Sequence, residues 1–130
     1  MVLGELKRNM LELQLQNKLV TVISDKMVLR NGALVRGGQL TSASNEFSDT
    51  IYEAYQSGVI TMSERNRVND TDSIVRATSR ETLNAVYVAI EASYVIDHTD
   101  VNRAHQTAEI VAKIFPEAEV FAMVLSLIHI

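Results

Sequence analysis

The stretch NAVYVAIEASYVIDHTDVNRAHQTAEIVAKIF, residues 84–115, decides the fold of this 130-residue chain. Its first half alternates between two faces, as a β-strand does. The residues of one face are Val86, Val88, Ile90, Ala92, Tyr94 and Ile96, and those of the other are Ala85, Tyr87, Ala89, Glu91, Ser93 and Val95. Because both faces are largely apolar, we expect a strand that is covered on each side. Glu91 is the exception, since a carboxylate inside such a strand is costly unless it is paired, protonated or bound to a cation.

The second half of the same stretch predicts a helix. Asp97 and Thr99 are candidate N-caps, and Asp100 places negative charge in the first turn. The inward positions recur at steps of three and four: Val101, Ala104, Ala108, Val111 and Phe115. Pro116 ends the helix, and residues 119–125, EVFAMVL, predict another strand. Strand, helix and strand at this spacing predict a right-handed crossover between parallel strands.

Upstream of this stretch, the pattern is mainly helical. Residues 1–27 predict a long helix, although the alternation within LELQLQ also suits a strand. Asn31-Gly32 and Gly37-Gly38 then punctuate the chain around a short extended piece, ALVR. Residues 42–58 predict a second helix that ends at Gly58. Thr61 and Glu64 have the capping-box spacing of a third helix, which runs to about Val68.

The segment before residue 84 completes the predicted sheet. Residues 72–76, DSIVR, predict a strand, residues 78–82 a turn, and the strand over 84–96 would pair with the first as a hairpin. We therefore expect one domain over residues 1–130, with a mainly helical part at 1–70 and the sheet with its crossover helix at 71–127. The predicted class is α/β, bordering on α+β, with long N-terminal helices and a small mixed sheet.

Composition limits the classes of function. The chain has no Cys, which excludes disulfides and thiolate metal sites and suits the cytoplasm. Its net charge of -4 and its low aromatic content of 5% disfavour a basic nucleic-acid binder and a base-stacking platform. Any contact with phosphates must then be local or cation-assisted. We expect no membrane partner, because no long uncharged run is present, and no signal peptide, because charges interrupt the first apolar residues.

Two carboxylates are the strongest candidates for chemistry. Asp72 opens the first strand of the hairpin and Glu91 lies well along the second, so antiparallel pairing can bring them together. They repel each other unless a cation or a shared proton lies between them. With oxygen ligands only, the ions that fit are Mg²⁺ and Mn²⁺, and such an ion can activate water and stabilise charge on a phosphodiester. The structural alternatives are a turn cap for Asp72 and an ion pair between Glu91 and Arg76 across the hairpin.

Several short patterns, in this order, resemble the PD-(D/E)XK nuclease-like superfamily, and in particular an uncharacterised bacterial branch that is frequent in cyanobacteria. They are GVIT with Glu64, DSIVRA from Asp72, VYVAIEAS ending at Ser93, and DVNRA from Asp100. The opening ELKRNMLELQLQNK also looks like the first helix of that branch. The resemblance implies a restriction-endonuclease-like core and Mg²⁺-dependent hydrolysis of DNA. Many members act as dimers, so it also implies a homodimer.

By position, the resemblance makes Asp72 and Glu91 metal ligands and Glu12 a third carboxylate on a helix. The superfamily motif ends in Lys where this chain has Ser93, and a hydroxyl supplies no positive charge. The candidates for a substitute or supporting group are Arg103, Arg76, Asp100, Lys7 and Arg8, although Asp100 and Arg103 also have the spacing of a plain helix ion pair. Without a substitute, the domain would be a non-catalytic nucleic-acid- or protein-binding module. A purely structural α/β domain, with its carboxylates satisfied by Arg, is the third hypothesis.

The last six residues, LSLIHI, resemble translated sequencing adapter. We therefore expect the domain to be truncated at its C-terminal end and the native sequence to differ beyond about Val124. On this interpretation His129 carries no functional weight.

Overall fold

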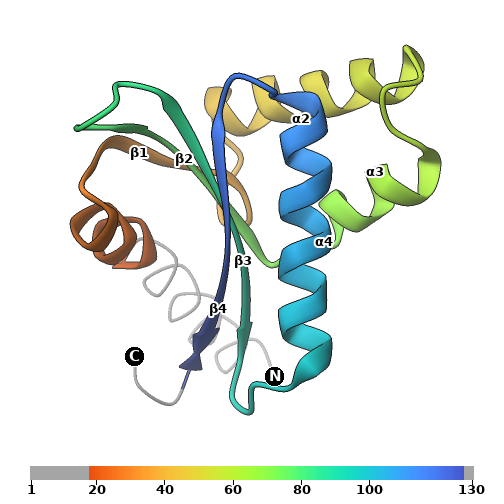
Figure 1. Ribbon diagram of the computed structural model, residues 1–130. Helices are drawn as coiled ribbons and strands as arrows, with labels where there is room; N and C mark the ends of the chain where they lie inside the picture. Colours follow the sequence, from red (N-terminus) through yellow and green to blue (C-terminus); the bar gives the residue numbers. More distant parts are fainter. Residues whose placement is uncertain (1–17, 128–130) are drawn as a thin grey trace, which may run out of the picture.

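A computed structural model describes residues 18–127 (Figure 1). Helical residues 18–27 come first. They are followed by β1 (Leu29–Arg36), α2 (Ser42–Gln56), α3 (Met62–Asn69), β2 (Ser73–Ser79), β3 (Ala85–Ser93), α4 (His98–Ile114) and β4 (Glu119–Ser126). This arrangement confirms the predicted α/β class. The predictions for the first part of the N-terminal helix, and for Glu12, Lys7 and Arg8, lie outside the described residues.

The four strands form one mixed sheet in the order β1-β2-β3-β4. The pairs β1–β2 and β2–β3 are antiparallel, whereas β3 and β4 are parallel and α4 connects them. The predicted hairpin and the predicted parallel crossover are therefore confirmed. In the hairpin Ser73 pairs with Ile90, so that Asp72, one residue earlier, comes opposite Glu91.

β1 corrects the prediction that Asn31-Gly32 punctuates the chain before a short extended piece, ALVR. The strand runs through this dipeptide, and its register with β2 shifts between Arg30 and Ala33. Asn31 has a φ of 56°, a left-handed conformation that Asn adopts more readily than most residues. Asn-Gly therefore forms a β-bulge inside a strand rather than a turn between two elements.

Two boundaries around the hairpin also differ from the prediction. β2 continues to Ser79, so the predicted turn at 78–82 starts later. β3 ends at Ser93, and Tyr94 to Ile96 follow it as an exposed connection to α4. The alternation of apolar residues continued past the point where strand pairing stops, and alternation alone does not locate the end of a strand.

The helix boundaries follow their local signals. Capping boxes start α2 at Thr41, α3 at Thr61 and α4 at Asp97. The sequence predicted the box at Thr61 and gave Asp97 as one of two candidate N-caps for α4. Gly58, with a φ of 81°, follows α2 as expected. On α4 the predicted inward residues Ala104, Ala108 and Val111 are buried, whereas Val101 in the first turn is exposed.

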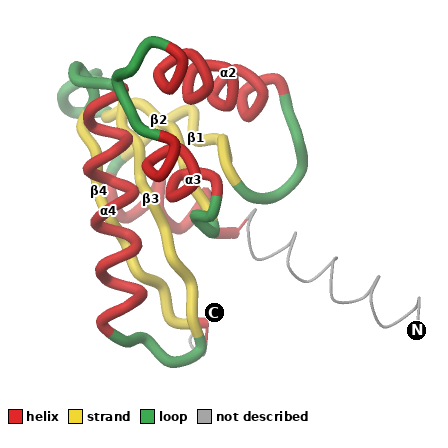
Figure 2. The backbone as a smooth tube through the Cα atoms, turned by 90° about the vertical axis from the view of Figure 1, so that its right-hand side faces the viewer, coloured by secondary structure: helices red, strands yellow, loops and turns green. Residues whose placement is uncertain are grey.

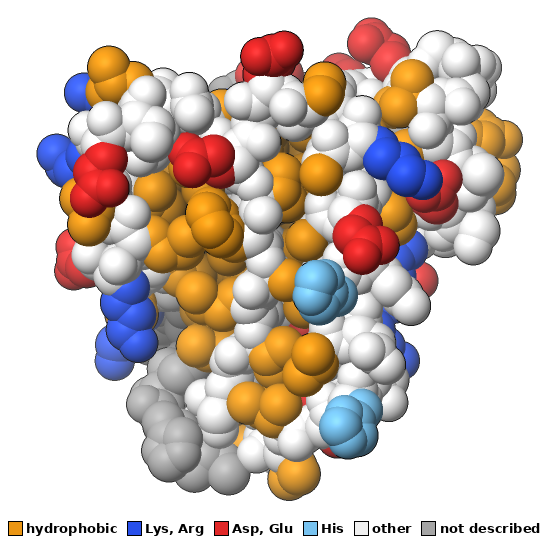
Figure 3. Space-filling view, in the orientation of Figure 1, with side chains coloured by type: hydrophobic (Ala, Val, Ile, Leu, Met, Phe, Trp, Pro, Cys, Tyr) orange, Lys and Arg blue, Asp and Glu red, His pale blue; other side chains and the backbone are white. Residues whose placement is uncertain are grey.

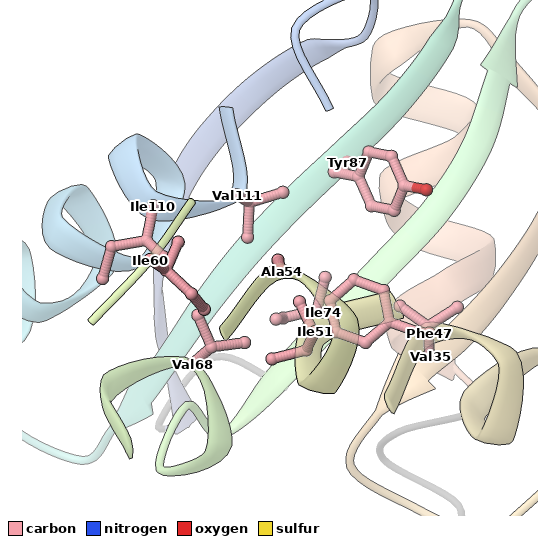
Figure 4. Close-up of a cluster of buried hydrophobic side chains, with 10 residues drawn as sticks. All are labelled: Val35, Phe47, Ile51, Ala54, Ile60, Val68, Ile74, Tyr87, Ile110 and Val111. Atoms are coloured by element: carbon pink, nitrogen blue, oxygen red, sulfur yellow. The ribbon is translucent and has the colours of Figure 1, made fainter. Parts of the chain in front are cut away.

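The two faces of β3 pack against different helices (Figures 1 and 2). Val86, Val88 and Ile90 pack with Leu19 and Ile23 of the helical residues 18–27. On the other face the sheet packs against α2, α3 and α4 through the cluster drawn in Figure 4: Val35, Phe47, Ile51, Ala54, Ile60, Val68, Ile74, Tyr87, Ile110 and Val111. Burying each large aliphatic side chain contributes about 1.5–3 kcal/mol, so both faces hold β3 in place. This confirms the prediction of a strand covered on each side.

None of the helices in residues 18–127 combines the length and the apolar character that crossing a bilayer requires.

Candidate functional site

Glu91 lies on the α4 side of β3 and is only 3% exposed. Asp72 occupies the opposite position, directly before β2, and is exposed. Its Oδ2 accepts a hydrogen bond from the backbone N–H of Ala92 at 2.9 Å, which holds its carboxylate beside that of Glu91. The structure thus brings together the two carboxylates that the sequence singled out. We call Asp72 and Glu91 the carboxylate pair.

Arg67, on α3, is the counter-charge of this pair. Its Nη2 donates to Oε1 of Glu91 at 3.1 Å. The suggested partner, Arg76, is instead 4.0 Å from Glu46, because Arg76 pairs with Tyr87 in the sheet, four residues along β3 from Glu91. Four residues of a strand span about 13 Å, too far for an ion pair. The suggested Glu91–Arg76 ion pair is therefore wrong.

The surroundings of Glu91 change its acidity. Burial raises the pKa of Glu91 to about 7, from its ordinary 4.5, and the hydrogen bond and negative charge of Asp72 act in the same direction. The Arg67 guanidinium opposes this rise without cancelling it. Near neutral pH the Glu91 side chain is therefore close to the midpoint between its protonated and ionised forms.

The donor set suits a hydrated divalent ion. Mg²⁺ is usually held by one or two carboxylates and keeps several of its waters. Among residues 18–127, no three or more His, Asp or Glu side chains gather at a common point. In this part of the chain the carboxylate pair would therefore offer a divalent ion two side-chain ligands, and their oxygen donors are of the type that Mg²⁺ or Mn²⁺ prefers.

The other predicted site residues in the described part of the chain lie outside the carboxylate pair. The Ser93 hydroxyl donates to the carbonyl of Val95 at 2.8 Å, in the turn that follows β3. The Asp100 carboxylate accepts from the Asp97 backbone at 3.0 Å and completes the N-terminal cap of α4. Arg103 is exposed on α4, and among residues 18–127 it forms no ion pair with Asp100. Neither Asp100 nor Arg103 is part of the carboxylate pair.

Two hollows adjoin the site. One has a volume of about 420 Å³ and is lined by Asp72, and the other, of about 370 Å³, is lined by Arg67. On the face seen in Figure 3, Lys and Arg side chains are scattered among acidic and apolar ones and do not form a continuous basic band.

Arg67 is the site residue that sequence reasoning missed. It lies 24 positions before Glu91, on a helix that the hairpin does not involve. Its only sequence signal is that it is a basic residue in the last turn of a short predicted helix, which is ordinarily explained by the helix dipole.

No protein-family model, curated protein or solved structure matches this chain. The structure itself shows an α/β domain with a mixed sheet, in which two carboxylates lie side by side on adjacent strands and an arginine pairs with one of them.

Proposed function

We propose that this chain is a nuclease-like domain of the PD-(D/E)XK superfamily, in which Asp72 and Glu91 hold Mg²⁺ or Mn²⁺ for hydrolysis of a DNA phosphodiester. One observation carries the proposal: a buried carboxylate on β3 faces a second carboxylate at the start of β2. Even with Arg67 beside it, Glu91 keeps a raised pKa, so the ionised pair raises the free energy of the folded state unless a proton or a further cation is bound. A site that costs stability in this way is typical of function.

The order of the elements supports this proposal. A helix, three antiparallel strands, a crossover helix and a parallel fourth strand agree with the restriction-endonuclease-like core that the resemblance implies. In this chain α2 and α3 are inserted between β1 and β2. The insertion matters for the chemistry because α3 carries Arg67 to the carboxylate pair.

In the proposed site Arg67 supplies the positive charge that Ser93 does not. An arginine stays protonated at any physiological pH, so Arg67 cannot accept a proton from water. When a divalent ion is bound, it lowers the pKa of its own water. Arg67 then holds Glu91 in place and stabilises negative charge that develops on a phosphate next to it.

A plasmid-nicking assay in Mg²⁺ or Mn²⁺, with metal binding followed in parallel by calorimetry, tests the proposal. Glu91→Gln and Asp72→Asn should each abolish metal-dependent nicking and weaken metal binding by at least about tenfold, since each removes one charged ligand. Glu81→Gln, in the exposed turn between β2 and β3, is the matched control and should change neither. Circular dichroism checks that the variants fold. Nicking that survives both substitutions would refute the proposal.

A second candidate function is a binding module that has lost the reaction. The specific observation in its favour is that Ser93 stands at the position of the motif lysine and its hydroxyl is bonded to Val95. Metal binding without nicking by the native chain would favour this function. A gain of nicking in Ser93→Lys would show that the missing cation is the cause. If the chain binds no metal at all, the structural α/β hypothesis is the one that remains.

A further inference from the structure

The larger hollow beside the site has the features of a ligand subsite. It is a cavity of about 420 Å³, within the usual range of about 300–1,000 Å³ for small-ligand pockets. Its walls come from the end of β1, the loop 37–41, one side of α2, and the segment that joins α3 to β2. Figure 2 shows this loop as the wide connection between β1 and α2. Asp72 is both a wall of this cavity and a member of the carboxylate pair.

The walls of the cavity are held by specific contacts. Gly37 and Gly38 have φ values of 86° and 74°, which other residues adopt only with strain, and they turn the loop at the end of β1. The Arg36 guanidinium donates to the carbonyl of Asn69, which joins the end of β1 to the end of α3. The Thr71 hydroxyl contacts that of Thr107 on α4. The opening beside Asp72 is therefore a built feature of the fold.

The charge of the walls selects the chemistry of the ligand. Two carboxylates, Asp70 and Asp72, and one guanidinium, Arg36, line the cavity, so negative charges outnumber positive ones, and Arg36 also donates to the carbonyl of Asn69. These walls repel a phosphate group and accept hydrogen bonds from a neutral donor. Leu40, whose side chain is 83% exposed, offers an apolar surface at the edge. A flat heterocycle that carries an amino group satisfies both requirements.

We propose that this cavity binds the base of an unpaired nucleotide, with an amino-bearing edge toward Asp70. Carboxylates accept hydrogen bonds from the N4 amino group of cytosine, whereas thymine presents a carbonyl at that position. The inference rests on the proposed function, and it makes single-stranded or locally unpaired DNA the substrate class. Extruding a base from a duplex costs free energy, and the cost is least where the base is already unpaired. A base in the cavity would place its phosphodiester next to Asp72, where the proposed metal ion on the carboxylate pair would offset the repulsion between phosphate and carboxylate.

An NMR titration of the whole chain with neutral nucleosides, in EDTA, tests the inference. 2′-Deoxycytidine should shift the backbone amide signals of Gly37, Gly38 and Asn69, and it should bind at least about fivefold more tightly than thymidine, as a single added hydrogen bond allows. Asp70→Asn should bring the ratio of the two affinities close to one. Asp25→Asn is the control, because Asp25 is exposed on the helical residues 18–27, which pack on the other face of the sheet.

A second variant keeps the test independent of the chemistry of Asp70. Ser48 lines the cavity from α2 and is exposed, so Ser48→Phe should fill the space and abolish the shifts caused by both nucleosides. The inference is overturned if neither nucleoside shifts these amides, or if thymidine binds as well as deoxycytidine. Because the nucleosides have no phosphate and the buffer has no metal, this result and the plasmid-nicking result can fail separately.

Discussion

Two polar contacts lie side by side at the start of β2, and they differ in chemistry. The hydroxyls of Thr71 and Thr107 are 2.8 Å apart, and Thr71 also donates to the carbonyl of Arg67 at 3.1 Å, so Thr107 must donate to Thr71. This contact is neutral, and the hydroxyl of Thr71 has both an acceptor and a donor. The next residue, Asp72, belongs to the carboxylate pair, whose members can carry negative charge.

The two contacts also differ in how completely their polar groups are hydrogen-bonded. The Nε of Arg67 is buried without a hydrogen-bond partner among residues 18–127, and the pKa of Glu91 is raised to about 7. A satisfied neutral contact rigidifies a core, whereas an incompletely satisfied charged one retains binding capacity. We therefore interpret the Thr71–Thr107 contact as structural, whereas the carboxylate pair is the site at which we propose that a metal ion binds.

The largest effect is expected when the counter-charge is removed. Arg67→Met should lower the free energy of unfolding by about 2 kcal/mol at pH 8, because the guanidinium no longer favours the ionised form of Glu91, which must then take up a proton to stay buried. At pH 5 the loss should fall below about 1 kcal/mol, since Glu91 is then protonated. Urea unfolding at both pH values measures the difference. The control is Arg103→Met, at an exposed position of α4, which should change the free energy of unfolding little at either pH. An equal loss for Arg67→Met at both pH values would contradict this account.

The native chain itself should show a pH dependence of stability in EDTA. Because the pKa of Glu91 is raised from 4.5 to about 7, the folded state binds this proton more tightly than the unfolded state does. The stability from this proton is complete below about pH 4.5, is lost as the pH rises to about 7, and changes no further above that. We expect a loss on the order of 2 kcal/mol relative to Glu91→Gln, measured by urea unfolding at several pH values. A constant difference between the two proteins would contradict the raised pKa.

Removing the Thr71–Thr107 hydrogen bond should lower the free energy of unfolding by the same amount at every pH. Thr107→Val should cost about 1 kcal/mol at pH 5 and at pH 8, because it removes one buried hydrogen bond and no charge. The double variant Thr71→Val with Thr107→Val should cost less than the sum of the two single variants, since fewer hydroxyl groups are left without partners. Thermal and urea unfolding measure both. A pH-dependent loss in Thr107→Val would mean that this contact is coupled to the carboxylate pair.

The smallest change in stability is expected at Asp72. Asp72→Asn keeps an oxygen that can accept from the Ala92 N–H and removes a negative charge beside Glu91, so it should stabilise the fold by about 0.5 kcal/mol at pH 8. The same variant should lose at least about tenfold in Mg²⁺ affinity by calorimetry. Gain of stability with loss of binding would distinguish this residue from Thr107. Loss of stability would instead favour a structural role for Asp72.

Much of the fold could be predicted because its signals are local. Capping boxes at Thr61 and Asp97 act within one helical turn, and the alternation along residues 84–93 reports the two covered faces of β3. The antiparallel hairpin then brought Asp72 near Glu91 without further information. The prediction failed at β1, where Asn31-Gly32 has the composition of a turn and forms a bulge only because β2 pairs on both sides of it.

The sequence by itself determined the secondary structure of the second half of the chain and the two acidic residues of the candidate site, since these depend on neighbours within a few residues or across one hairpin. Only the tertiary structure decided which basic side chain pairs with Glu91. Arg67 reaches it from α3, and Arg76, the nearer choice along the chain, points to Glu46 instead. The packing of a helix against a sheet depends on burying many apolar side chains that are far apart in the sequence. The residues next to Arg67 therefore do not indicate where its guanidinium will lie.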